Sequence, residues 1–172
     1  MRVWLITVGE PLPTDGDKVR LLRTGILAGL LDTAGHQIIW WSSSFNHTDK
    51  RQRFHEDTTL RVSPRLEIKL LYAPGYERNI SARRIVNHRR IARKFAAAAT
   101  REIPPDVILC SFPTIELSKA ATDYGDARGI PVVVDVRDRW PDTFINVVPK
   151  LVRPLAKPLL LGMLRDTRKA LQ

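Results

Sequence analysis

Apolar and polar positions alternate along the chain with the two periods that distinguish strands from helices. Short apolar or alternating runs predict the strands of a sheet, over residues 2–8, 36–42, 66–72, 106–110 and 131–135. Apolar positions three or four residues apart predict helices, over residues 18–34, 81–101 and 113–124. Strands that alternate with helices indicate an α/β fold, a Rossmann-like parallel sheet with helices on both faces.

The first predicted helix has clear signals along its length. Val19, Leu22, Ile26 and Leu30 recur on one face, and Gly35 occupies the C-cap position that ends the helix. In contrast, residues 43–65 are polar and show no clear period. They predict an unusually long loop, of the kind that is functional or mobile.

Composition places the chain among globular proteins. Its 172 residues fit one domain, 44% of them are hydrophobic, and Cys110 is the single cysteine, which excludes an internal disulfide. That suits a reducing cytoplasm. The apolar start is too short for a signal peptide, and the apolar stretch 155–164 is far short of a membrane span. We expect a soluble cytoplasmic protein, peripheral at most on the inner face of the membrane.

The net charge of +10 is concentrated in two segments. Residues 77–102 carry eight Lys and Arg against two Glu, and residues 149–172 carry six against one Asp. The rest of the chain is close to neutral. A local anionic partner is therefore expected: phospholipid, a pyrophosphate-linked substrate or nucleic acid.

The basic helix shows how its share of this charge is arranged. At about 100° per residue, Arg83, Arg90, Lys94 and Arg101 fall within roughly 40° of one another. They form a predicted anion-binding ridge opposite an apolar face that docks on the sheet. The alternative is a merely solvated face, although such a face normally mixes the two signs of charge.

Ligands of open parallel sheets bind at the carboxyl ends of the strands, which selects the loops 9–17, 42–65, 111–114 and 136–142. In the first loop, Gly16 precedes the predicted helix, whose N-terminus favours phosphate. The loop does not have the glycine spacing of a dinucleotide fingerprint. The alternative is a plain turn in which Asp15 or Asp17 caps the helix.

Charged residues crowd the loop after the fifth predicted strand, from Asp135 to Asp142. A carboxylate and a guanidinium there could bind sugar hydroxyls and phosphate oxygens. The alternative is an ion pair, Arg137 with Asp138 or Arg139 with Asp142, that holds the loop.

Other chemistry has little support in the residue spacing. No His, Asp or Glu pattern around His47 and His55 matches a metal site, and Cys110 has the apolar neighbours of an inert core thiol.

Several motifs resemble, in their order and spacing, the glycosyltransferase family 4 enzymes of polysaccharide and O-antigen assembly. They span nearly the whole chain: Pro11-Leu12-Pro13-Thr14-Asp15-Gly16 with Arg20 and Arg23, Gly35-His36, Trp40-Trp41-Ser42-Ser43-Ser44-Phe45-Asn46-His47, Lys50, Arg53, Pro74-Gly75-Tyr76, Asn79, Arg84-Ile85-Val86-Asn87-His88 and Val134-Asp135-Val136-Arg137-Asp138-Arg139-Trp140-Pro141.

This resemblance implies a retaining enzyme of the two-domain GT-B fold, of which this chain is the N-terminal half. Residues 1–148 would be the acceptor-binding domain, and residues 149–172 a basic amphipathic tail leading to a C-terminal domain that holds the nucleotide-sugar donor. The acceptor would be a saccharide, often lipid-linked. No metal or other cofactor is implied, and the 172 residues alone would be inactive.

The resemblance also assigns residues. Many family members end the last of these strands with His-Asp, and this sequence has Arg137-Asp138, so Asp138 matches and Arg137 departs. We expect catalytic roles for Asp138 and Arg137. The expected substrate-binding residues are Asp15, Gly16, Arg20, His47 and Trp140.

Two other functions stay open. The first is a basic α/β module that binds nucleic acid, although no recognition motif or aromatic stacking pattern accompanies the arginines, so we expect no nucleic-acid partner. The second is half of a sugar-nucleotide epimerase.

Overall fold

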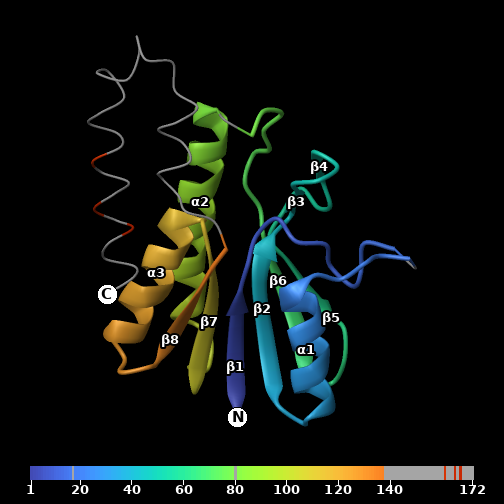
Figure 1. Ribbon diagram of the computed structural model, residues 1–172, viewed down its shortest axis with the longest axis vertical. Helices are drawn as coiled ribbons and strands as arrows, with labels where there is room; N and C mark the ends of the chain where they lie inside the picture. Colours follow the sequence, from blue (N-terminus) through green and yellow to red (C-terminus); the bar gives the residue numbers. More distant parts are fainter. Residues whose placement is uncertain (17, 80, 138–160, 162–164, 166, 168–172) are drawn as a thin grey trace.

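The computed structural model describes residues 1–16, 18–79, 81–137 and the single residues 161, 165 and 167. Most of the predicted tail, with Asp138 and Trp140, lies outside them. The described chain builds a six-stranded sheet of order β5-β6-β2-β1-β7-β8 (Figure 1). The strands are β1 (Arg2–Ile6), β2 (Gln37–Ser43), β5 (Thr58–Arg61), β6 (Leu66–Leu71), β7 (Val107–Phe112) and β8 (Val132–Val136).

Helices cover both faces of this sheet, as the sequence predicts. All strand pairs are parallel except β5 with β6. Helix α1 (Arg23–Thr33) lies on one face, and α2 (Ala82–Ala99) and α3 (Ile115–Asp126) lie on the other (Figure 1). The α/β fold class is therefore confirmed.

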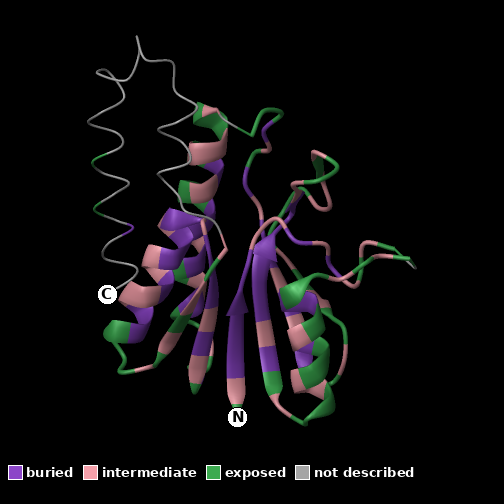
Figure 2. Cartoon of the chain, in the orientation of Figure 1, coloured by how far each residue is buried: buried purple, intermediate pink, exposed green. Residues whose placement is uncertain are grey.

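Alternate side chains of β1 and β2 pack into two separate hydrophobic cores, one on each face of the sheet. Figure 2 shows that β1 is buried over most of its length. Trp4 and Trp41 pack with Phe95 of α2 under the helix pair, and Trp40 packs with Ala28 on the α1 side. The Trp4 and Trp41 rings meet edge to face with centroids 5.4 Å apart. Such a pair contributes about 1 kcal/mol beyond the area it buries.

Helix α1 differs from its prediction in two respects. It begins at Arg23 rather than near Lys18, and its apolar residues Leu22, Ile26 and Leu30 are 43%, 55% and 64% exposed. The buried positions are Thr24, Gly25 and Ala28, whose small side chains let the helix lie close to the sheet. The end of the helix is as predicted: Gly35 has a φ of +84°, and its N–H donates to the Asp32 carbonyl at 3.0 Å.

The segment 43–65 is not the featureless loop that its composition predicts. It contains a small hairpin of β3 (Phe45–Asn46) and β4 (Arg51–Gln52), followed by β5. Strand β5 pairs antiparallel with β6 at the edge of the main sheet. These strands are too short for an apolar period to show, and backbone hydrogen bonds form them instead.

Helix α2 starts at a Ser81 cap, whose side chain accepts a hydrogen bond from the Arg84 N–H at 3.2 Å. It ends at Ala99, so Arg101 lies beyond the helix. The last turn of helix α3, which ends at Asp126, lies close to the start of β8. A Cβ at Gly125 would lie 2.7 Å from the Ile130 carbonyl oxygen and closer still to the Val132 side chain, so this position requires glycine.

Candidate functional site

The sheet reverses its strand order beside β1. From β1 the chain builds outward through β2 and β6, and it then returns to place β7 and β8 on the other side of β1. The loops that follow β1 and β7 therefore diverge, which opens the crevice where ligands of such sheets bind. A cavity of about 160 Å³ lies there, lined by Val8, Gly9, Ser43, Phe45, His47, Tyr76, Arg84, Asn87, His88, Pro113 and Thr114.

A buried carboxylate lies beside this crevice, just after β1. The Glu10 side chain is only 4% exposed. It accepts hydrogen bonds from the Thr24 N–H at 3.1 Å and the Thr24 hydroxyl at 2.9 Å. Glu10 thus occupies the N-terminus of α1 and fixes where this helix begins. An external phosphate at this helix end would have to displace the protein's own carboxylate.

Arg137 compensates the charge of Glu10. Its guanidinium donates to Glu10, to Asp135 at 2.8 Å and to the Thr24 hydroxyl at 3.1 Å. Burial acts to lower the pKa of Arg137, but the bonds to Glu10 and Asp135 outweigh it and raise the pKa. Asp135 also pairs with Arg23 at 2.5 Å. Arg137 therefore has partners other than the Asp138 considered from the sequence.

A chain of hydroxyls continues this network through the sheet. The Thr24 hydroxyl donates to Glu10, so Thr7 must donate to Thr24 at 2.9 Å, and Ser111 to Thr7 at 2.9 Å. The network joins β1, β7, α1 and the end of β8. Sequence reasoning missed Thr7, Glu10, Thr24 and Ser111. The detectable signal was a carboxylate that directly follows an apolar strand.

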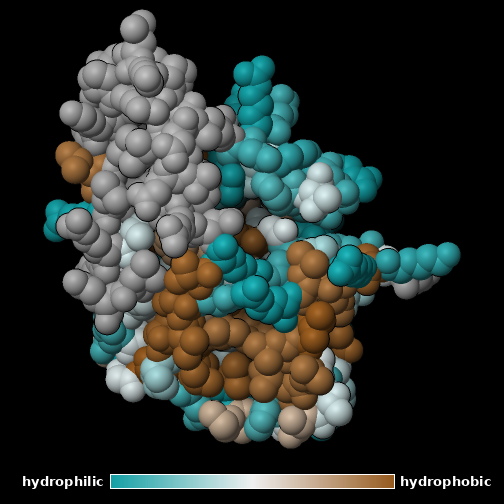
Figure 3. Space-filling view, viewed as in Figure 1, coloured by the Kyte–Doolittle hydropathy of each residue, from teal (hydrophilic) through white to brown (hydrophobic). Residues whose placement is uncertain are grey.

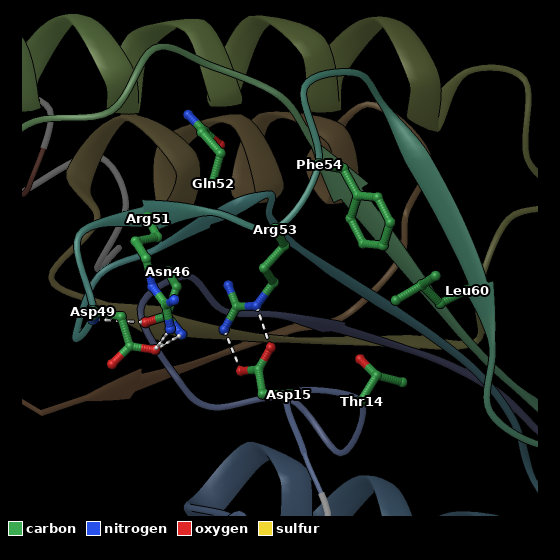
Figure 4. Close-up of a pocket in the computed structure, with 9 residues that line it drawn as sticks. All are labelled: Thr14, Asp15, Asn46, Asp49, Arg51, Gln52, Arg53, Phe54 and Leu60. Carbon is green, nitrogen blue, oxygen red and sulfur yellow. Dashed lines mark hydrogen bonds and ion pairs between the residues drawn. The ribbon is translucent and has the colours of Figure 1, made fainter.

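Asp15, farther along the loop 9–16, ties this loop to the β3–β4 hairpin. The Asp15 carboxylate accepts two hydrogen bonds of 2.5 Å from Arg53 and one of 2.9 Å from the Leu12 N–H (Figure 4). Burial acts to raise the pKa of Asp15, but the hydrogen bonds from Arg53 and Leu12 and the charge of Arg53 outweigh it and lower the pKa. Asp15 caps no helix, because α1 begins at Arg23.

The same loop corrects the expectation for Gly16. This residue has a φ of +148° and lies well before the first turn of α1, so it does not present a helix N-terminus to a phosphate. Arg20 is exposed farther along the loop. A cavity of about 360 Å³ separates this loop from the hairpin, with Asp15 and Arg53 in its wall (Figure 4). His47 lies in the other cavity, so the structure does not gather the predicted substrate-binding residues into one site.

His47 belongs to a cluster of side chains at the mouth of the crevice. Its Nδ1 atom lies 2.8 Å from the Tyr76 hydroxyl and 3.4 Å from the Lys50 ammonium. Lys50 donates in turn to the Asn79 side chain at 2.6 Å. Burial, with the charges of Lys50 and Arg84, lowers the pKa of His47, so its ring is neutral at neutral pH.

His88 lies deeper in the same cavity. Burial, with the charges of Arg84 and His47, lowers the pKa of His88 to about 3. Its Nδ1 atom lies 4.0 Å from the Glu116 carboxylate, a contact that would be an ion pair only if the ring were protonated. Because burial dominates, we take the ring as neutral.

The outward face of α2 carries arginines, but not the predicted set. Arg83 and Arg90 are exposed, and Arg93 is exposed beside them. Lys94 instead donates to Asp57 at 2.6 Å. Lys94 lies on the helix where its spacing predicts. Helical spacing cannot predict its contact with Asp57, because Asp57 comes from the segment before β5.

Cys110 is a buried thiol within β7. Burial raises its pKa to about 12, which fits the interpretation of an inert core residue. No group of His, Cys, Asp and Glu suited to a metal ion occurs among the described residues. Within the same part of the chain, every helix is too short or too polar to cross a membrane.

Comparison with known proteins adds no assignment. No protein-family model matches the chain, and no curated protein sequence matches it.

Proposed function

We propose that this chain is the acceptor-binding domain of a retaining glycosyltransferase, the N-terminal half of a GT-B fold. Such an enzyme would move a sugar from a nucleotide donor to a saccharide acceptor, which the crevice beside β1 would hold. The sequence motifs described above supply the resemblance, and the fold class is compatible with it.

The observation that carries the proposal is the polar crevice at the point where the strand order reverses. Its wall combines hydroxyl, amide, imidazole and guanidinium groups with an aromatic ring, from Ser43, His47, Tyr76, Arg84, Asn87, His88 and Thr114. Groups of these kinds hydrogen-bond sugar hydroxyls and place an apolar surface beside a pyranose ring. Three separate strand ends and the start of α2 converge here.

Within this proposal the Glu10, Arg137 and Asp135 cluster is a rigid support beside the crevice, outside its lining. Its mutual ion pairs hold the loop after β1 against the end of β8. By resemblance, Asp138 is the residue expected to act on the reacting sugar. Arg137 would contribute to the reaction indirectly, as a positioning residue.

Saturation-transfer NMR on the 172-residue chain tests the acceptor role. Methyl glycosides of hexoses and N-acetylhexosamines should receive saturation from the protein, whereas a short DNA duplex should not. Thr114→Val should weaken the sugar signal several-fold. Thr114 lines the cavity, and its side chain makes no capping hydrogen bond to α3, so the substitution removes a hydroxyl and leaves the helix start intact.

The matched control is Thr59→Val, on the exposed side of β5 and outside the crevice. It should bind the glycosides as the parent chain does. An absence of saturation transfer to every glycoside, or equal binding by Thr114→Val and the parent chain, would contradict the acceptor role. Tight binding of the duplex alone would favour the nucleic-acid module instead.

A further inference from the structure

The side chains around His47 combine positive charge with hydrogen-bond donors. Lys50 lies 3.4 Å from His47, and the Arg84 guanidinium lies 5.9 Å from the Tyr76 ring centroid. Lys50 lies 5.0 Å from the same centroid. Among the described residues that line this cavity, none is Asp or Glu. Two cations therefore flank one aromatic ring at the rim of a cavity without a lining carboxylate.

The hydrogen bonds of His47 fix which way its proton points. An ammonium group can only donate, so Lys50 donates to Nδ1, and this atom is an acceptor. The proton of the neutral ring is then on Nε2, which has no hydrogen-bond partner among the described residues and can donate to a ligand. The imidazole adds an uncharged N–H donor to the two cations.

Lys50 is held in a conformation that its residue type rarely adopts. Its φ is +53°, and it is the single non-glycine with positive φ among the described residues. Its ammonium is fixed by Asn79 at 2.6 Å. Backbone strain of this kind persists where surrounding contacts over-determine it, and it clusters at ligand clamps. The hairpin turn thus presents a positioned ammonium beside the cavity.

We propose that Lys50, Arg84 and His47 form an oxyanion subsite that holds a phosphoryl group. A phosphate monoester carries a charge of about −1.5 to −2 at neutral pH, so it matches two cations where a carboxylate would match only one. Arg84, whose Nη1 also donates to the Asn79 carbonyl at 2.9 Å, adds its positive charge, and His47 Nε2 can donate to a phosphoryl oxygen. The inference rests on the proposed function only for which molecule carries the group: the acceptor saccharide.

Phosphate titration of the 172-residue chain, followed by NMR of the histidine rings, tests this subsite. Inorganic phosphate should shift the His47 ring signals and raise the His47 pKa, whereas the His36 and His55 signals should stay in place. Lys50, Arg84, Tyr76 and His88 are the groups that face His47. Acetate at equal ionic strength should bind more weakly.

Lys50→Asn is the decisive variant, because asparagine tolerates positive φ and carries no charge. It should weaken phosphate binding about tenfold or more, as expected for the loss of a charged hydrogen bond. The control Arg93→Gln removes one exposed cation from the outer face of α2 and should change binding less than twofold. Thermal unfolding of both variants verifies that they fold.

Three results would overturn the subsite. They are unchanged His47 signals at tens of millimolar phosphate, equal losses in Lys50→Asn and Arg93→Gln, and acetate binding as tight as phosphate. The ring titration needs no variant, so a Lys50→Asn chain that failed to fold would still leave a decisive measurement. Phosphate binding without glycoside binding would retain the subsite and reject the acceptor role, and the reverse result would do the opposite.

Discussion

Folding buries the negative charge of Glu10, and the ion pair with Arg137 compensates the free-energy cost of this burial. Arg137→Ala would leave the carboxylate buried beside α1 without its cation. We expect a loss of about 3 kcal/mol in the free energy of unfolding, as for other broken buried pairs. Urea unfolding would measure it.

A double variant tests whether the lost stability comes from the unpaired charge of Glu10. Glu10→Gln combined with Arg137→Met removes both charges and should recover most of the stability lost in Arg137→Ala. If Arg137→Ala unfolded at the parent urea concentration, the network would contribute little to stability. Arg137 would then be available for the direct binding of phosphate that the sequence suggested.

His88 makes stability depend on pH. Its folded pKa of about 3 is below the ordinary value of 6.5, so the unfolded chain binds a proton that the folded chain refuses. Stability should be complete above about pH 6.5 and fall by about 2 kcal/mol between pH 7 and pH 5. Urea unfolding across this range checks the slope.

The variants for this slope are His88→Gln and His55→Gln. His88→Gln should remove most of the slope, and His55→Gln, at an exposed position, should leave it unchanged. His47, whose pKa is also lowered, accounts for the slope that remains. Asp15 does not confuse the comparison, because the pKa of Asp15 is lowered from 3.8 and its effect falls below this range. A parent chain whose stability is constant from pH 7 to pH 5 would contradict the neutral, buried assignment of His88.

Residue types alone could not predict these partners. Asp15 was a reasonable helix cap from its position, but its partner Arg53 lies 38 residues away. Glu10 and Arg137 are 127 residues apart. Local sequence signals how a residue affects its own turn or helix. It does not signal which distant side chain the fold brings beside it, and the charge network is built from such pairs.

At the level of elements, the apolar period correctly predicted the strands and helices that bury long apolar faces. The parallel strands and helices α2 and α3 bury several apolar residues each, so their patterns are visible in the sequence. The start of α1 depends on a single buried carboxylate, and β5 depends on backbone pairing. Neither interaction produces an apolar period in the sequence. The start of α1 and the structure of the segment that contains β5 were therefore predicted wrongly.

The outer face of α2 predicts binding to anionic membranes. Arg83, Arg90 and Arg93 are exposed, and no salt bridge within the described residues involves them. Vesicles with phosphatidylserine should bind the chain at low salt, and neutral vesicles should not. Arg90→Gln and Arg93→Gln should each weaken binding about fivefold, since one charge near such a surface contributes about 1 kcal/mol.

Lys94→Gln is the matched control for this helix. Lys94 lies on the same element, but it is engaged with Asp57, so its loss should change vesicle binding little. Flotation of all variants at low and high salt gives the comparison. Equal binding to neutral and anionic vesicles would rule out an electrostatic contact, and an equal effect of Lys94→Gln would rule out this face of the helix.

At the scale of the whole molecule, the described helices cover one side of the sheet more fully than the other. On one face α3 lies over β1, β7 and β8, and α2 lies beside it over β6, but on the opposite face α1 packs mainly against β2. Within the described part of the chain, Leu109 and the 54% exposed Val133 thus have no helix above them. Figure 3 shows a continuous hydrophobic surface across this region.

Helix α1 extends this surface. Its central residues 25–31 carry no polar side chain, and Ile26 and Leu30 face outward. A helix segment that is apolar all round is typically buried on all sides. Between α1 and β8 there is a largely apolar cavity of about 370 Å³, with Leu27, Leu109 and Val133 in its wall. Monomeric proteins rarely expose a large continuous apolar surface unless another molecule binds there.

The 172-residue chain should therefore bind a hydrophobic dye while it is fully folded. The fluorescence of anilinonaphthalene sulfonate should rise strongly, and Ile26→Lys with Leu30→Lys should remove most of that rise. Both positions are more than half exposed, so the substitutions should leave the urea midpoint nearly unchanged. Ile103→Lys, at an exposed apolar residue outside α1 and β8, is the control and should keep the parent fluorescence. Dye binding that persists in the double variant, or that appears only as the chain unfolds, would mean that this surface is not the apolar site.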